Sequence, residues 1–372
     1  MPLDLLMVAA LIGAILIGYP VAFSIAGVGA LFALLGGALG QFDMGLLGAL
    51  GQRVFGILTN DVLIAIPLFV LMGVLLEKSR LAEDMLETIG RLFGHLRGGL
   101  GVSVVLVGAM LAASTGIVGA TVVAMGLIAL PTMLRTGYDK RLAAGVVCTA
   151  GTLGQIIPPS TLLIILADVM SNAYQQAQYA EGQFTIDTLS VGELFAAALL
   201  PGLLLVSLYV LYLLGRAWLQ PESAPPVRER SGRPGRAAVL RATLPPALLI
   251  VAVLGAILGG VATPTEAASV GAVGALLATG LRLARSGIAR LAVWAAALAI
   301  VAMLVLTAFV DLRLGRAAAT LGDEEAIVAA AALVVVLALG LAVGLALAWR
   351  HDVLVPVVTR TMTISSMIFA TI

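Results

Sequence analysis

Long apolar runs, separated by short polar segments, follow one another along almost the whole chain. Many of these runs reach the roughly 20 residues that an α-helix needs to cross the hydrocarbon core of a bilayer. The runs are continuously apolar and do not alternate, which favours helices over the strands of a β-barrel. The pattern therefore predicts an all-α polytopic membrane protein. The expected segments are residues 1–20, 98–135, 142–170, 194–214, 242–258, 267–281, 288–310, 326–349 and a last run from 353.

Composition supports this fold class and narrows the classes of function. Of the 372 residues, 61% are hydrophobic and 11% are charged, whereas about a quarter of the residues of a soluble domain are charged. The net charge of +1 gives no basic surface for nucleic acid. A single cysteine, Cys148, excludes an internal disulfide and a cysteine metal cluster, and His95 and His351 lie far apart in expected loops. We expect no transition-metal site.

Basic residues indicate the side of the membrane that each loop faces, because Lys and Arg are enriched in cytoplasmic loops. Residues 142–215 contain no Lys or Arg, and the polar loop inside them carries Glu181, Asp187 and Glu193, so this loop is expected outside. The segment 98–135 begins and ends with basic residues on the cytoplasmic side. Basic clusters occur at residues 78–97, 135–141, 216–241, 282–290 and 350–360.

The segment 98–135 must therefore enter the membrane and return. Its two apolar halves are shorter than a full span and are joined by STGIV, Ser114 to Val118. Two thin spans are one interpretation, but a loop at the far surface would more often be charged or longer. A re-entrant hairpin, with its tip near the middle of the membrane, is the favoured interpretation.

The next apolar segment contains GTLGQIIPPST, Gly151 to Thr161, in its middle. Pro158 and Pro159 cannot donate backbone hydrogen bonds, and Gly154 allows non-helical geometry. Irregular backbone within a membrane is tolerated where protein or a water-filled cavity meets its polar groups, and transporters use such breaks to bind ions and substrates. The stretch predicts a broken helix, with a proline kink that only shapes packing as the alternative.

Neutral oxygen atoms surround this break. Hard cations favour oxygen ligands, and a neutral ligand set suits a weakly held monovalent ion such as Na⁺. The hairpin tip is expected to meet the break. For the hydroxyl groups, helix back-bonding or small-residue packing is the alternative. The predicted sodium and substrate site comprises Ser114, Thr115, Gly116, Gly151, Thr152, Gly154, Gln155, Pro158 and Ser160.

Few other polar residues fall in or near the apolar runs. Asn60 or Asp61 is expected to cap the apolar helix that follows them. Glu266 follows a proline at a helix start, where a carboxylate is stabilised by the helix dipole. Asp168 is expected near the outer end of its helix, at the membrane interface.

Five motifs follow one another along the chain: GYPVAFSIAG, TNDVLIAIPLFVLMGVLLEKSRLAEDML, GATVVAMGLIALPTMLRTGYDKRLAAG, GTLGQIIPPS and GVATPTEAASVGA. Together they resemble the large membrane subunit of tripartite ATP-independent periplasmic (TRAP) transporters, over nearly the whole chain. The resemblance implies an ion-transporter-superfamily architecture of two inverted repeats, each with a re-entrant hairpin and a broken helix. It implies elevator-type, Na⁺-coupled import across the bacterial inner membrane, with Na⁺ as the coupling ion and no other cofactor. The implied partners are a small four-helix membrane subunit, a periplasmic substrate-binding protein and a small organic acid, often a carboxylate.

The chain departs from the resemblance in three places. Ile117 and Val118 stand where many members have serines, which leaves backbone carbonyls as ligands there. The region 282–350 is longer than in most members and is similar to the mannitol or chloroaromatic subgroup. The second hairpin and second broken helix would follow TISSMIFATI at 363–372. We therefore expect a carboxy-terminal part to be missing, and we expect that this chain alone does not transport.

The same reasoning divides the chain into functional parts. An amino-terminal scaffold with an interfacial helix is expected first, then a transport part, an outer loop with a returning span, a cytoplasmic linker, and an incomplete second repeat with an inserted pair of spans. These parts are residues 1–97, 98–172, 173–215, 216–241 and 242–372, with the inserted pair near 288–349.

Two other functions stay open at this point. One is a carrier of the same superfamily that needs no binding protein, and the other is a non-transporting scaffold fragment. An intramembrane enzyme is disfavoured, because a hydrolase needs a nucleophile with a base in reach. Neither histidine lies in an expected span, and the chain has no G-x-S-x-G motif.

Overall fold

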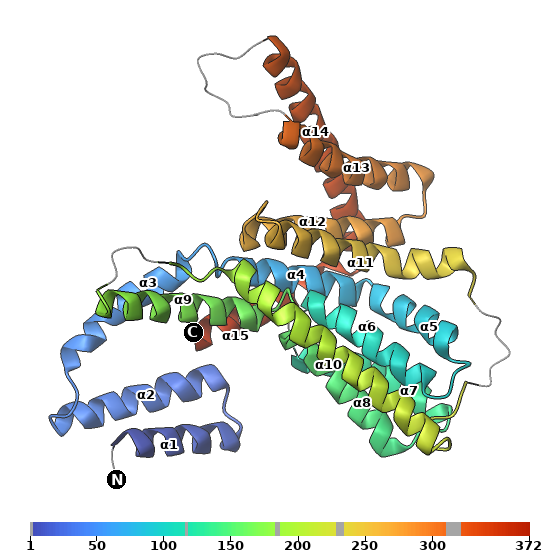
Figure 1. Cartoon of the computed structure of the whole chain (residues 1–372). Coiled ribbons are helices and arrows are strands. Elements are labelled where there is room, and N and C mark those ends of the chain that lie inside the picture. Colours follow the sequence, from blue (N-terminus) through green and yellow to red (C-terminus); the bar gives the residue numbers. More distant parts are fainter. Residues whose placement is uncertain (1–2, 116–117, 183–186, 228–233, 310–320) are drawn as a thin grey trace.

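The computed structural model describes residues 3–115, 118–182, 187–227, 234–309 and 321–372. Within these ranges every regular element is helical, as the apolar pattern predicts (Figure 1). The α-helices are α1 (Leu3–Ile17), α2 (Val21–Ala38), α3 (Leu50–Leu58), α4 (Ala65–Lys78), α5 (Leu81–Phe93), α6 (Gly99–Thr115), α7 (Val118–Arg135), α8 (Lys140–Thr152), α9 (Thr161–Ala180), α10 (Val191–Leu219), α11 (Arg236–Leu258), α12 (Pro264–Leu283), α13 (Gly287–Phe309), α14 (Leu321–Arg350) and α15 (Leu354–Thr371). Two short 3₁₀-helices are η1 (Met44–Ala49) and η2 (Leu153–Gln155).

Six of the described helices are long and apolar enough to cross a membrane. Much of their apolar surface is exposed, as at Leu200, Leu211 and Trp218 of α10. Exposed apolar surface on this scale indicates contact with lipid or with another membrane protein. The chain is a multi-pass membrane protein, as predicted. The six helices are α2, α10, α11, α12, α14 and α15.

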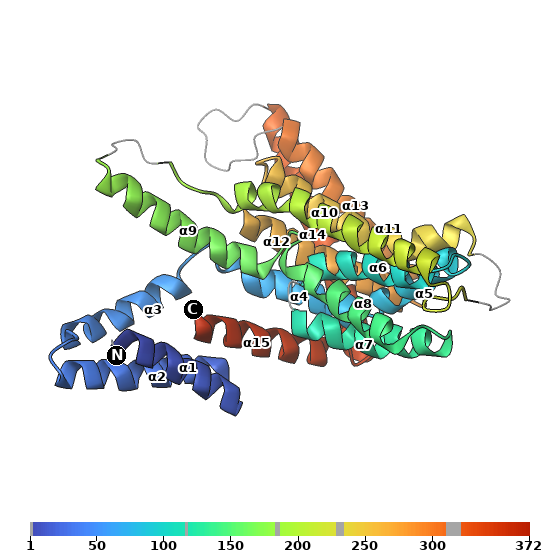
Figure 2. The same ribbon diagram turned by 60° about the horizontal axis from the view of Figure 1, so that its bottom comes forward.

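One buried core surrounds the hairpin of α6 and α7. These two helices pack against each other and against α8, and α5 and α10 close the sides (Figure 2). Val104, Val107, Met125 and Ala150 lie in this core with no exposed surface. The break between α8 and α9 therefore lies at one end of a well-packed helical block.

A second core is built around α4, which contacts α12, α15 and α6. The sequence of α4 is apolar on nearly every side, and a helix of this kind is buried on all sides. Gly271 of α12 allows close packing here, because a Cβ atom at that position would lie 2.8 Å from the Met72 sulfur and 3.0 Å from the Val253 side chain. The early helix α4 and the late helix α12 thus share one interior.

The pair α13 and α14 projects from α12 in Figure 1, and its two helices pack against each other and against α12. The two helices approach closely at Gly340, where a Cβ atom would lie 2.2 Å from the Cβ atom of Ala296. Leu277 of α12 joins Val293 and Ala296 in a small core that attaches the pair. Helices are present at both spans expected near 288–349, and their interpretation as an inserted pair stays a prediction.

Several helices extend beyond their predicted ends. Helix α9 continues to Ala180, and α11 begins at Arg236, before the apolar run itself. Helix α10 starts at Val191 because Ser190 and Glu193 form a capping box there. An apolar run shows which part of a helix can lie in the hydrocarbon core of the bilayer. The helix itself can continue through polar residues beyond that run. The division of the chain into scaffold and transport parts stays a prediction.

Candidate functional site

The helix interruption predicted at GTLGQIIPPST is confirmed. Helix α8 ends at Thr152, the 3₁₀-helix η2 follows, and α9 does not begin until Thr161. The intervening residues include Pro158 and Pro159, which are buried and joined by a cis peptide bond. Neither proline has an N–H group, so the helical ladder cannot continue through them.

Hydrogen bonds within the break pair some of the backbone groups that the interrupted helix leaves without helical partners. The Ile157 N–H donates to the Leu153 carbonyl at 2.9 Å. The Ser160 hydroxyl donates to the Gln155 carbonyl at 2.9 Å and accepts from the Leu163 N–H at 3.4 Å. Ser160 is fully buried and is the N-cap of α9. This serine therefore joins the two ends of the break.

Both arms of the α6–α7 hairpin contact the last turn of α8 at small residues. A Cβ atom on Gly151 would lie 2.4 Å from the Val122 side chain and 3.0 Å from its backbone. A Cβ atom on Gly108 of α6 would lie 2.7 Å from the Ala150 Cβ atom. Glycine at both positions lets α7 and α6 approach the helix end directly before the break.

The remaining predicted residues of the break differ in exposure. Gly154 and Pro158 are buried like Gly151, and Gln155 is half-buried. Thr152 is exposed, and its hydroxyl donates to the Thr149 carbonyl at 2.8 Å. The back-bonding that was the alternative for the hydroxyl groups is therefore present at Thr152. Its oxygen keeps lone pairs that can still accept or bind a cation.

The hairpin tip lies largely outside the described residues. Ser114 and Thr115 are the last residues of α6, but their side chains fall outside the description, and so do Gly116 and Ile117. Val118 begins α7. Helix α6 does contact η2, so the structure brings this arm to the break. Whether the tip side chains ligate an ion stays a prediction.

Two helix ends of opposite polarity flank the break. The carboxyl end of α8 carries a partial negative charge, and the amino end of α9 carries a partial positive charge. Discontinuous helices of this kind bind anionic groups at their amino ends and cations at unwound carbonyls. The polarity of the break is therefore suited to a cation on the α8 side and to an anion on the α9 side.

Sequence reasoning missed one residue that packs on the break. Gly202 of α10 crosses it so closely that a Cβ atom would lie 3.1 Å from the Ile157 side chain and 3.7 Å from the Ile156 carbonyl oxygen. The dipeptide Pro201–Gly202 in the middle of an apolar run was the available signal. A proline beside a glycine within a span often marks a close approach of another backbone.

The prediction that Asn60 or Asp61 caps the helix that follows them is only partly confirmed. The side-chain oxygen of Asn60 does accept from the Val62 N–H, at 2.9 Å, but α4 begins later, after an N-cap at Ile64 without a side-chain bond. The Asn60 amide donates to Asp168 of α9 at 2.9 Å. The expectation that Asp168 lies near the outer end of its helix is wrong, because α9 continues to Ala180.

The same segment is held from a second direction. The Asp61 carbonyl accepts a hydrogen bond from the Thr265 hydroxyl of α12. One turn therefore connects α9, through Asn60, to α12, through Asp61. The prediction for Glu266 is confirmed, since it forms a capping box with Thr263 at the start of α12.

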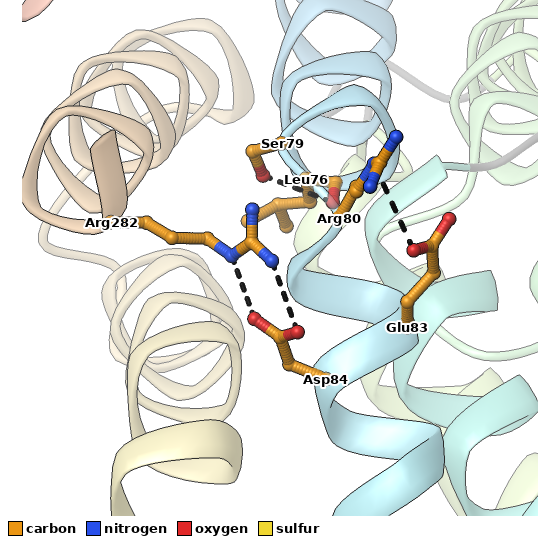
Figure 3. A network of polar contacts seen from close by, with 6 residues as sticks. All are labelled: Leu76, Ser79, Arg80, Glu83, Asp84 and Arg282. Carbon is orange, nitrogen blue, oxygen red and sulfur yellow. Dashed lines mark hydrogen bonds and ion pairs between the residues drawn. The ribbon is translucent and has the colours of Figure 1, made fainter.

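Charged residues gather at the turn between α4 and α5 (Figure 3). Arg282, in the last turn of α12, donates two hydrogen bonds to Asp84 of α5. Arg80 adopts a left-handed backbone conformation, and its Nε atom lies 3.9 Å from the Oε2 atom of Glu83. The turn is further held by the Ser79 hydroxyl, which donates to the Leu76 carbonyl. These contacts fix α5 relative to α4 and α12.

A family model described as the tripartite ATP-independent periplasmic transporter, DctM component, matches residues 8–370. The chain belongs to this family. The family consists of transporter components, which agrees with the transporter interpretation and sets the enzyme alternative aside. Together with the six candidate spans, it describes a multi-pass protein of the bacterial inner membrane.

Individual relatives carry names from the same family. A C4-dicarboxylate TRAP transporter large permease protein of Pseudomonas aeruginosa is 37% identical over 227 residues, which are 60% of this chain and 48% of the relative. A second, from Vibrio cholerae, is 33% identical over 268 residues, 70% of this chain and 52% of the relative. An ectoine TRAP transporter large permease protein of Halomonas elongata is 29% identical over 265 residues, 71% of this chain and 56% of the relative.

The chain spans about half the length of the curated relatives it matches. The mannitol or chloroaromatic subgroup and a missing carboxy-terminal part stay predictions.

Proposed function

We propose that this DctM-family chain is part of a Na⁺-coupled, binding-protein-dependent secondary transporter that imports a small organic acid. The observation that carries the proposal is the contact of both hairpin arms with the last turn of α8, at Gly151 and Ala150. Because the hairpin packs on the broken helix, a ligand that orders the break can also order the hairpin tip. The two relatives named for C4-dicarboxylates support a carboxylate as the substrate class.

The coupling ion is proposed to bind where α8 ends. Unwound carbonyls and the negative end of α8 attract a cation. The Thr152 hydroxyl oxygen adds a neutral ligand at the last residue of this helix. The proposed ligands from the hairpin are Ser114, Thr115 and the backbone near Gly116.

The substrate carboxylate is proposed to bind next to the amino end of α9. Ser160 caps the Leu163 N–H group there, and the positive end of the helix dipole favours an anion. Bound Na⁺ would hold the hairpin tip against the break and so complete the anion site. Substrate binding then depends on Na⁺, and the block built on α6, α7 and α8 moves past the scaffold as an elevator.

The proposed partners are a small four-helix membrane subunit and a periplasmic binding protein. Exposed apolar faces on α2 and α10 provide membrane-embedded surface for lipid and for the membrane subunit. The binding protein would deliver the organic acid to the outer face.

The test is the thermal stability of the complete large subunit, purified with its small partner, in NaCl and in KCl at equal ionic strength. A ligand present at a hundredfold excess over its Kd stabilises the folded state by about 2.7 kcal/mol. We expect a Na⁺-specific rise in melting temperature that Thr152→Val removes. Thr149→Val is the matched control, because its hydroxyl also bonds back, to the Gly145 carbonyl at 2.8 Å, but lies one turn before the break.

Equal melting temperatures in NaCl and in KCl would refute Na⁺ binding. Proton coupling would then be the hypothesis to test. A Na⁺ effect that survives in Thr152→Val would remove this residue from the site. Uptake of a dicarboxylate into proteoliposomes with and without the binding protein then separates this proposal from a carrier that works without one.

A further inference from the structure

A groove of about 590 Å³ lies between α8 and α10 and extends along α8 from its first turn to Thr149. Its walls are apolar and include Leu142, Val146 and Leu208. Arg141, in the first turn of α8, and Arg216, near the end of α10, also line it. Because the two helices run in opposite directions, both arginines lie at the same end of the groove.

That end of the groove carries two arginines that form no ion pair within the described part of the chain. Both Arg141 and Arg216 are exposed. Asp139 also lines the groove and contributes one negative charge, and its carboxylate accepts the backbone N–H groups of Arg141 and Leu142. With two guanidinium groups against one carboxylate, the groove mouth keeps a net positive charge that fits a phosphate group.

The length of the groove matches one leaflet of a bilayer. Along α10 its lining runs from Leu205 to Arg216, a distance of about 16 Å at 1.5 Å per residue. Half of a hydrocarbon core of about 30 Å is about 15 Å. The arginine end is the cytoplasmic end, since basic residues cluster at 135–141 and 216–241.

Tyr209 and Tyr212 line the same groove, about two turns and one turn of α10 before Arg216. Tyrosines are enriched at the level of lipid head groups, where the ring contacts acyl chains and the hydroxyl contacts polar groups. The order of residues from Leu205 through the tyrosines to Arg216 thus follows the order of groups in a phospholipid, from acyl chain to phosphate.

We propose that this groove binds one anionic phospholipid of the cytoplasmic leaflet. Its phosphate lies between Arg141 and Arg216, and an acyl chain runs along Gly145 and Val146 towards Leu205. Gly145 leaves room for the chain, because a Cβ atom there would meet nothing within 4 Å. The inference does not depend on the proposed transport function.

The experiment is native mass spectrometry of the purified, delipidated full chain, titrated with phosphatidylglycerol or with phosphatidylcholine. A basic residue near a membrane surface contributes about 1 kcal/mol to binding an anionic lipid, so each arginine is expected to supply about a fivefold gain in affinity. We expect Arg141→Gln with Arg216→Gln to lower phosphatidylglycerol affinity by about 25-fold and phosphatidylcholine affinity by much less, because the choline group offsets the charge of its phosphate. Arg135→Gln is the matched control, because Arg135 is exposed at the same side but does not line the groove.

A second pair of variants tests the acyl chain without touching charge. Gly145→Leu should fill the groove and weaken binding, whereas Gly215→Leu, also in open space but outside the lining, should not. Equal binding of both lipids, or equal losses in Arg135→Gln, would overturn the proposal. So would competition by inorganic phosphate as strong as by the lipid, because the apolar groove would then contribute nothing. If a helix of another membrane protein fills the groove instead, the wild-type chain will show no preference for phosphatidylglycerol.

Discussion

The Arg282 guanidinium and the Asp84 carboxylate meet in a two-pronged contact, with Nε–Oδ2 at 2.6 Å and Nη2–Oδ1 at 3.0 Å (Figure 3). The two residues are 198 positions apart in the sequence. Asp84 lies in the first turn of α5 and Arg282 in the last turn of α12. Each charge is therefore also stabilised by the dipole of its own helix. The pair joins the amphipathic helix α5 to the second core.

Replacing Arg282 by lysine should weaken this connection, because an ammonium group cannot bond both carboxylate oxygens in the planar geometry of arginine. Both side chains are about a third or more exposed, so the expected loss of unfolding free energy is about 0.5–1 kcal/mol. A double-mutant cycle of Asp84→Asn and Arg282→Gln, followed by thermal unfolding in detergent, measures the coupling. Arg285→Lys, beyond the end of α12, serves as the control. A coupling that does not fall as salt is raised would contradict an electrostatic contact.

Apolar periodicity predicted the helical fold and most of its segments, because hydrocarbon-length runs have few other structures available to them. It did not predict which helices touch. The contact between α4 and α12 depends on Gly271 meeting Met72, and residues so far apart in sequence leave no local signal. Asn60 shows the same limit, since its short-range bond to Val62 was predictable and its bond to Asp168 was not.

At the candidate site, the break itself was predictable from Pro158 and Pro159, because proline removes backbone donors wherever it stands. The exposure of Thr152 was not predictable, since it depends on which side of α8 the hairpin covers. Gly202 was missed for a related reason. A glycine in an apolar run gives no indication of which backbone will cross it until the helices are packed.

Ser160 should be more important for stability than an exposed hydroxyl group in the spans. Ser160→Ala removes a buried hydroxyl that bonds both Gln155 and Leu163 and is expected to cost about 1–2 kcal/mol of unfolding free energy. Ser207→Ala is the matched control, because Ser207 is exposed and only bonds back to Leu203. Thermal unfolding in detergent compares the two. Equal, small losses in the two variants would show that the Ser160 hydrogen bonds do not stabilise the break.

Tyr138, in the short connection between α7 and α8, should make stability depend on alkaline pH. Burial raises the pKa of its hydroxyl above the ordinary value, and hydrogen bonds from the Gly101 and Leu100 backbone lower it by less. The folded state thus favours the neutral phenol. The neutral Tyr138 side chain contributes fully to stability below about pH 10, the ordinary pKa of tyrosine. This contribution is lost as the pH rises through the raised pKa of the folded state.

The measurement for Tyr138 is the melting temperature from pH 9 to 11, with the phenolate absorbance recorded in parallel. Tyr138→Phe should lower stability at pH 9, because the Gly101 N–H loses its acceptor at 3.2 Å, and should flatten the dependence above pH 10. Tyr174→Phe removes an exposed tyrosine and should change neither. If both variants keep the wild-type slope, the pH dependence arises elsewhere in the chain.

The contact between the hairpin and α8 gives the sharpest prediction, because one helix contains two glycines in opposite environments. Gly151→Ala places a Cβ atom against the Val122 side chain and backbone, and overpacking of this kind costs about 1–3 kcal/mol. Gly145→Ala adds the same atom in open space and should stabilise the helix by about 0.5–1 kcal/mol. Opposite shifts in melting temperature are therefore expected from the same chemical change. Val122→Ala should recover part of the loss in Gly151→Ala, since it removes the nearest side-chain atom and leaves the backbone contact at 3.0 Å. If Gly151→Ala is as harmless as Gly145→Ala, the hairpin does not pack on the break as described, and the proposed coupling between the ion site and the hairpin tip fails with it.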